Sequence, residues 1–199
     1  MTQQDQEDWS WRRRAQSSLE HGLQAAIATG AIDPQRIGVT GLSDGATSAI
    51  WALIHSPMFA AASLSSCCID NGSLEVAGPA LVKAFEKDGY PSPIDAATGF
   101  WHESSLAANA DRISVPILLQ LSDDEYLNGL KSWYQYRARG RPIEMYVFPG
   151  ERHIKWQPAH RLAIYERNVD WFDFWLNGRE NPEPIDPSQY ERWRNMKGR

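Results

Sequence analysis

The chain has 199 residues, of which 42% are hydrophobic, and its net charge is −5. A chain of this size can bury the core of one domain and is short for two. Its basic residues are scattered apart from the run at residues 12–14, so we expect no cationic face for nucleic acid. Its apolar runs fall short of the roughly 20 residues that span a bilayer, so we expect no membrane partner.

The N-terminus and the cysteines bear on location and chemistry. The N-terminus is polar and acidic, without a signal-peptide pattern, so we expect a cytoplasmic protein, or a periplasmic one if a signal precedes this sequence. Cys67 and Cys68 are adjacent and cannot form a disulfide framework, and we expect them to be structural rather than reactive. No cysteine or histidine cluster has the spacing of a zinc site, and we expect neither a metal nor a cofactor.

Helical and strand patterns alternate along most of the chain. Residues 9–29 carry apolar side chains at helical spacing, and this pattern stops at Gly30. Residues 36–40 are apolar and β-branched, and a glycine-bounded turn separates them from a helical run that ends at His55. Further strands are predicted at residues 59–65, 115–121 and 143–148, and further helices at residues 126–139 and 158–176. This order predicts an α/β fold with a mostly parallel sheet flanked by helices.

Two segments depart from this alternation. Residues 71–111 contain several prolines, glycines and aromatic residues, which predicts an irregular insertion with short helices over one end of the sheet. Residues 179–199 begin with a proline-rich stretch and end with many charges, which predicts a loosely docked C-terminal tail.

A candidate nucleophile lies at the turn after the strand at residues 36–40. The sequence Gly41-Leu42-Ser43-Asp44-Gly45 matches G-x-S-x-G, in which the glycines permit a tight turn that exposes a serine hydroxyl between a strand and a helix. The alternative is a glycine-bounded turn whose serine only caps the helix.

A serine nucleophile needs a general base, which follows it in the chain order of α/β hydrolases. His153 follows a predicted strand and precedes the last long helix, where such a base would lie; the alternative is an ordinary exposed histidine. The other histidines lie in predicted helices or in the insertion (His21, His55, His102 and His160).

The acid that orients this histidine is expected just after the strand at residues 115–121. Asp123, Asp124 and Glu125 all lie there, and any of them could reach His153 through a flexible turn. Such an acidic turn could also bind a metal or be merely solvated. The position of Glu125 relative to the strand favours it slightly, but the residues alone leave the choice open.

Several segments resemble the catalytic domain of prolyl oligopeptidase-type serine peptidases, which are α/β hydrolases. They are residues 32–37, the G-x-S-x-G turn at residues 41–45, and residues 115–119, 139–144 and 148–153. Within that superfamily, the sequences around Cys67, Glu125 and His153 are most similar to lasso peptide isopeptidases. The resemblance implies that residues 1–178 are a partial α/β-hydrolase catalytic domain, the C-terminal portion of the fold without its N-terminal strands.

The isopeptidase resemblance implies a catalytic triad and a reaction. That subfamily uses a glutamate as the acid, which selects Glu125 beside Ser43 and His153. The backbone N–H of Asp44 would form half of the oxyanion hole, although a tyrosine often follows the serine in related oligopeptidases. The implied reaction is hydrolysis of the isopeptide bond of a lasso peptide through an acyl-enzyme. The alternatives are a general oligopeptidase-like peptidase or esterase, and an inactive remnant of one.

The chain has few elements before the nucleophile. One predicted helix and one predicted strand precede Ser43, whereas the resemblance implies several strands, a second oxyanion donor and a propeller domain upstream. We therefore expect this chain to be the C-terminal fragment of a longer enzyme, with the upstream part and a peptide substrate as its partners.

Overall fold

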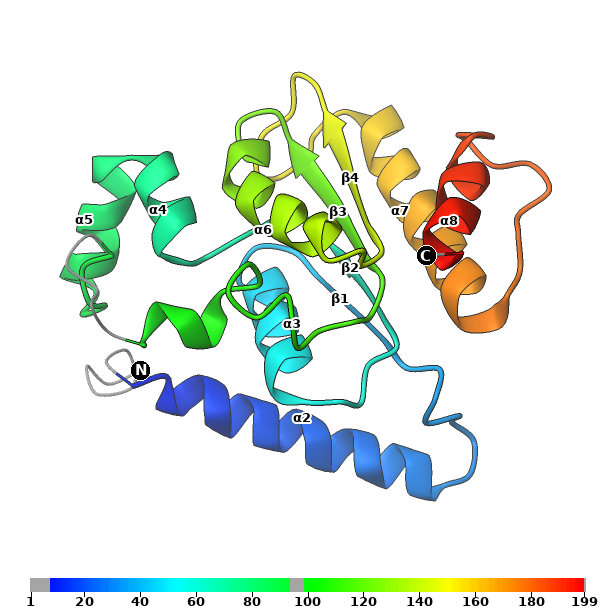
Figure 1. Cartoon of the computed structure of the whole chain (residues 1–199), viewed down its shortest axis with the longest axis horizontal. Helices are drawn as coiled ribbons and strands as arrows, with labels where there is room; N and C mark the ends of the chain where they lie inside the picture. Colours follow the sequence, from blue (N-terminus) through cyan, green and yellow to red (C-terminus); the bar gives the residue numbers. More distant parts are fainter. Residues whose placement is uncertain (1–7, 94–98, 199) are drawn as a thin grey trace.

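The structure is a computed structural model that describes residues 8–93 and 99–198. At its centre is a four-stranded parallel sheet in the order β1-β2-β3-β4 (Figure 1). The strands are β1 (Gly38–Gly41), β2 (Ala61–Leu64), β3 (Ile117–Ser122) and β4 (Ile143–Phe148). The parallel sheet predicted from the sequence is confirmed. Each strand ends within two residues of its predicted last residue, and the site residues follow these strand ends.

Helices cover both faces of this sheet. One face packs against α3 (Asp44–His55) and α6 (Tyr126–Ala138), through residues such as Leu119 of β3. The neighbouring Leu118 points to the other face, because successive side chains of a strand alternate, and there it packs against the C-terminal helices. These are α7 (Pro158–Phe172), its π-helical continuation η2 (Asp173–Asn177) and α8 (Gln189–Lys197).

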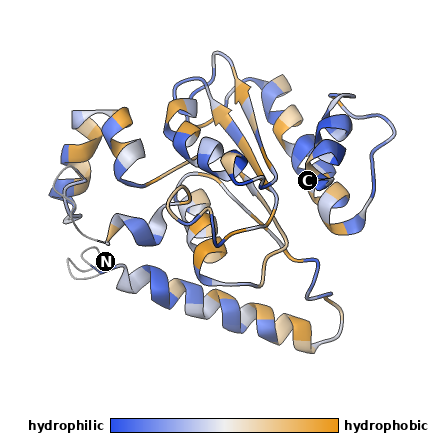
Figure 2. Ribbon diagram, viewed as in Figure 1, coloured by the Kyte–Doolittle hydropathy of each residue, from blue (hydrophilic) through white to orange (hydrophobic). Residues whose placement is uncertain are grey.

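The strand β3 forms the middle of the core. All six of its residues are buried between the helices on the two faces of the sheet, and the ribbon of the central strands is coloured mainly as hydrophobic (Figure 2). Tyr136 of α6 is fully buried on one of these faces, and its hydroxyl donates to the carbonyl of Val115 at 2.7 Å. An apolar strand that is buried on both faces is typical of a parallel sheet covered by helices.

The N-terminal helix and the predicted insertion pack together beside α3. The long helix α2 (Ser10–Ala28) crosses α3 at an angle and contacts it, and the insertion contains α4 (Asn71–Ala77), α5 (Pro79–Lys87) and the 3-10 turn η1 (Trp101–Ser104) (Figure 1). Residues 94–98 of the predicted insertion lie outside the described residues. An aromatic cluster joins Trp9 before α2 to Trp51 of α3 and to Trp101 of η1.

The C-terminal segment differs from the sequence prediction. We expected residues 179–199 to be loosely docked, but Tyr190 and Trp193 of α8 are 4% and 0% exposed. The indole N–H of Trp193 donates to the carboxylate of Glu144 in β4, and Arg192 Nε donates to the same carboxylate at 2.7 Å. The prediction of loose docking is wrong because two aromatic residues at helical spacing supply an apolar face among many charges.

None of the helices in the described part of the chain has both the length and the apolar character required to span a bilayer.

Candidate active site

The strand-turn-helix at the end of β1 holds Ser43 in a strained conformation. Ser43 has φ +58° and ψ −128°, a backbone region that residues other than glycine rarely occupy and that is associated with functional sites. A Cβ at Gly41 would lie 2.2 Å from the carbonyl oxygen of Gly45, so the turn requires glycine at its first position. The Ser43 hydroxyl makes no capping hydrogen bond to α3, which is the contact that the simple capping alternative requires.

The first turn of α3 follows Ser43 directly. Backbone N–H groups in the first turn of a helix have no intrahelical acceptor and carry the positive end of the helix dipole. The N–H of Asp44, the first residue of α3, is therefore suited to stabilise an anion that forms beside Ser43.

The structure brings His153 into contact with one of the three acidic residues after β3. His153 Nδ1 lies 2.5 Å from Glu125 Oε1. Asp123 instead accepts a hydrogen bond from the Gly150 N–H at 2.7 Å, and Asp124 accepts one from the Ser122 hydroxyl at 2.5 Å. Glu125 is therefore the acid that the geometry pairs with His153, although its catalytic role stays a prediction.

Two further groups hold the carboxylate of Glu125. The Ser122 hydroxyl shares its one proton between Asp124 and Glu125 Oε2, which lies 2.8 Å away, and the ammonium of Lys155 lies 3.4 Å from the same Glu125 oxygen. Burial alone would raise the pKa of Glu125, but the hydrogen bonds from His153 and Ser122 and the charge of Lys155 outweigh it, so this pKa lies below its ordinary value. Glu125 therefore stays ionised, as a group that orients and stabilises an imidazolium must.

Lys155 is a site residue for which the sequence analysis predicted no role. Its side chain is 4% exposed, and its ammonium donates to the carbonyl of Ser65 at 2.8 Å besides contacting Glu125. It thereby joins the loops that follow β2, β3 and β4. A buried cation needs an anionic partner, and a lysine two residues after a predicted catalytic histidine is a weak signal for this pairing.

Glu151 is a second residue without a predicted role, and it shapes the loop that carries His153. Its side chain is fully buried and accepts hydrogen bonds from the backbone N–H groups of Trp156 and Gln157 at 2.8 and 3.1 Å. It also contacts His160 Nδ1 of α7 at 2.8 Å. These contacts close the loop between β4 and α7 and fix where His153 lies.

Ser43, Asp44, Glu125 and His153 line one cavity of about 490 Å³. Among the described residues, none forms a hydrogen bond with the Ser43 hydroxyl, and His153 does not form one either. In free enzymes, catalytic hydrogen bonds are often long and tighten only when substrate binds. The other wall of the cavity is apolar and comes from α4 and α5, with Leu74, Leu81 and Phe85 among its residues.

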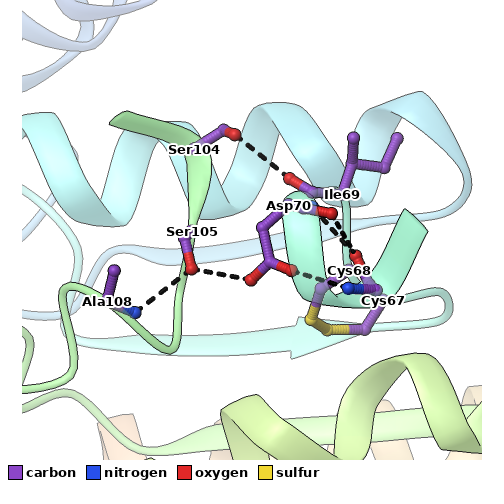
Figure 3. The surroundings of a disulfide bond; sticks show 8 residues. Cys67, Cys68, Ile69, Asp70, Ser104, Ser105 and Ala108 are labelled. Atoms are coloured by element: carbon purple, nitrogen blue, oxygen red, sulfur yellow. Dashed lines mark hydrogen bonds between the residues drawn. A yellow bond between two sulfur atoms is a disulfide. The ribbon is translucent and has the colours of Figure 1, made fainter. Parts of the chain in front are cut away.

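The two cysteines also line this cavity and are bonded to each other. They precede α4, where Asp70 caps the helix by accepting from the Ser73 N–H at 2.9 Å and also accepts from the Ser105 hydroxyl at 2.6 Å (Figure 3). The pair therefore lies where the loop after β2 meets the α4 wall. No set of histidine, cysteine and acidic residues within the described ranges is arranged as a metal site.

Comparison with known protein families identifies the fold. The model of the prolyl oligopeptidase family matches residues 8–179. The chain belongs to the prolyl oligopeptidase family. Its parallel sheet and its helices on both faces are those of the α/β-hydrolase fold of this family, which confirms the fold predicted from the sequence.

Two curated proteins are similar in sequence to this chain. It is 41% identical over 191 residues to lasso peptide isopeptidase AtxE2 of Asticcacaulis excentricus, covering 94% of this chain and 28% of AtxE2. It is 23% identical over 159 residues to dipeptidyl-peptidase 5 of Porphyromonas gingivalis, covering 73% of this chain and 22% of that protein. The chain thus spans less than a third of the length of these relatives.

Solved structures agree with this placement in the prolyl oligopeptidase family. The chain superposes on the AtxE2 isopeptidase without ligand with a TM-score of 0.93 at 39% identity, covering 98% of this chain and 30% of that one. A structure of a serine-to-alanine variant of AtxE2 with Astexin3-dC4 bound matches with the same TM-score. Pyrococcus horikoshii acylaminoacyl peptidase matches with a TM-score of 0.74 at 18% identity, covering 87% of this chain and 30% of that one, which is a likeness of fold.

Proposed function

We propose that this chain carries the catalytic residues of a serine isopeptidase that opens the macrolactam ring of lasso peptides. The observation that carries the proposal is the contact between His153 and Glu125, in the cavity that also exposes Ser43. The 41% identity to a lasso peptide isopeptidase supports the choice of substrate. A structure of that relative with Astexin3-dC4 bound supports a peptide as the ligand of this fold.

The proposed reaction is acyl transfer through Ser43. The Ser43 oxygen attacks the carbonyl carbon of the isopeptide amide, and His153 takes the hydroxyl proton. The N–H of Asp44 stabilises the oxyanion that forms on the carbonyl oxygen. His153 then gives the proton to the leaving amine, and the same residue activates a water that hydrolyses the ester on Ser43. The product is the linear peptide.

We propose that the chain works as part of a longer polypeptide and that the upstream part is required. The sheet presents β1 at its edge, and Val39 in this strand is only half-buried. The relatives are more than three times as long as the stretch that this chain matches. A second oxyanion donor and most of the contacts to a bulky threaded peptide would then come from upstream residues.

The decisive experiment is a mass-spectrometric assay on this chain and on the complete polypeptide of its reading frame. Threaded lasso peptides, their unthreaded isomers and linear peptides are offered as substrates. We expect the threaded peptides to gain one water at the isopeptide bond. Ser43→Ala should abolish this reaction, and Ser18→Ala, an exposed serine on α2, should not. Cleavage of linear peptides alone would instead assign a general oligopeptidase.

The acid is tested by substitutions at Glu125 and at the neighbouring Asp124. Glu125→Gln should lower turnover on the order of 10⁴-fold, the loss seen when the carboxylate of a serine-protease triad becomes an amide. Asp124→Asn changes a side chain that contacts the Ser122 hydroxyl and not His153, so it should cost far less. If an aspartate change abolishes turnover and Glu125→Gln does not, the assignment of Glu125 is wrong.

A further inference from the structure

A buried arginine from α2 reaches the residue that follows Ser43. Arg12 is 4% exposed, and its guanidinium pairs with the carboxylate of Asp44 and donates to the Ser48 hydroxyl at 2.7 Å. Its guanidinium carbon also lies 4.3 Å from the ring centre of Trp11, within range of a cation–π interaction. Arg12 therefore contacts the first turn of α3, although it lies in α2, 32 residues before Asp44 in the chain.

The charge of Asp44 is unfavourable for the proposed chemistry. Asp44 lines the same cavity as Ser43, and its backbone N–H is the predicted oxyanion donor. A carboxylate at this place repels the negative charge that develops on the substrate oxygen, because like charges several ångströms apart interact strongly near a protein surface. A cation paired with that carboxylate cancels the repulsion.

We propose that Arg12 is a positioning residue that favours oxyanion stabilisation at the Asp44 N–H by neutralising the Asp44 carboxylate. This inference rests on the proposed function, because it requires acyl transfer at Ser43. Arg12 is not among the residues that line the cavity of Ser43, and it acts through its contact with Asp44. A pairing of this kind affects the transition state more than the bound substrate, so it affects kcat and leaves KM nearly unchanged.

The test measures the second-order rate at which a fluorophosphonate labels Ser43 in the complete polypeptide, together with kcat and KM on a cleaved peptide. Arg12→Gln should lower the labelling rate and kcat about 10- to 100-fold, the range expected for one uncompensated charge near the reacting centre. Arg12→Lys keeps the charge but not the planar guanidinium that contacts both Asp44 and Ser48, so it should lose less than Arg12→Gln without matching the parent. Arg13→Gln is the matched control, because Arg13 is exposed and pairs with Glu103.

The double variant Arg12→Gln/Asp44→Asn separates charge from structure. If Arg12 acts by cancelling the carboxylate, removing both charges should restore most of the rate lost in Arg12→Gln. A double variant as slow as Arg12→Gln would overturn the inference. If Arg12→Gln does not fold, Asp44→Asn is the variant that tests the inference, because it leaves the Arg12 cation without its carboxylate. We then expect a fluorophosphonate to label Ser43 faster than in the parent. A tenfold slower labelling rate would overturn the inference.

Failure of the proposed function gives a different result. A folded parent polypeptide that does not label at Ser43 refutes the serine-hydrolase proposal and this inference with it. A parent that labels at the same rate as Arg12→Gln refutes only the inference.

Discussion

The two glycines of the serine turn should respond differently to the same substitution. A Cβ at Gly41 would lie 2.2 Å from the Gly45 carbonyl oxygen and 2.6 Å from the Ala46 nitrogen, and contacts under 3.0 Å are essentially never seen. Because both neighbours are backbone atoms, the turn must open by about 0.8 Å, and a displacement of about 1 Å at a catalytic group can cost roughly 100-fold in rate. Overpacking of this kind also destabilises a fold by about 1–3 kcal/mol.

The matched control is Gly45→Ala. A Cβ at Gly45 meets no atom within 4 Å, and Gly45 lies in the first turn of α3, where alanine is the better helix former. We expect Gly41→Ala to label with a fluorophosphonate about 100-fold more slowly than the parent. Gly45→Ala should label within about threefold of the parent and unfold at the same or a slightly higher temperature.

Labelling rate and thermal unfolding, measured on the same samples, separate misplacement of Ser43 from unfolding. A Gly41→Ala protein that is folded but labels slowly supports the geometric argument. Labelling of Gly41→Ala at the parent rate would refute it, because the substitution could then be accommodated without moving Ser43. Slow labelling of Gly45→Ala, with Gly41→Ala at the parent rate, would likewise contradict the argument from the space around these two glycines.

Three further outcomes follow from buried contacts. Trp193→Ala should lower the free energy of unfolding by about 3–5 kcal/mol in urea titrations, whereas Trp156→Ala at an exposed side chain should change it little. Lys155→Met leaves the Ser65 carbonyl without its donor and should cost about 1–3 kcal/mol, together with slower labelling of Ser43. The pKa of Glu125 is lowered from 4.5, so ionised Glu125 stabilises the fold above that pH and this stabilisation is lost as the pH falls below it. The difference in free energy of unfolding between the parent and Glu125→Gln should therefore shrink as pH falls. A difference that grows would contradict the lowered pKa.

The elements of the fold could be predicted because their signals are local. An apolar run such as β3, a glycine after a helix and the G-x-S-x-G turn each depend on a few adjacent residues. The same is true of the position of His153 between a strand and a helix. These local signals also placed Glu125 next to two other carboxylates. Its position relative to the strand favoured it only slightly, and the family resemblance was needed to choose among the three.

The contacts that complete the site could not be predicted because they join residues far apart in the chain. Lys155 lies 30 residues after Glu125, and Arg12 lies 32 residues before Asp44. A single sequence shows that a charged residue is present but not that folding will bury it beside an opposite charge. The tail was misjudged for a related reason, because its two buried aromatic residues are separated by two charged residues, of which Arg192 contacts the distant Glu144.

We therefore expect chemical reactivity and substrate choice to depend on different parts of the complete polypeptide. The proposed nucleophile, base and acid lie in loops that follow β1, β4 and β3, and their mutual geometry is fixed by contacts among residues of this chain. Reaction of Ser43 with a small electrophile depends mainly on these contacts, whereas recognition of a threaded peptide needs a surface much larger than one cavity of about 490 Å³. A chain that labels at Ser43 but does not open lasso peptides, beside a complete polypeptide that does both, would show that recognition lies upstream of the catalytic residues.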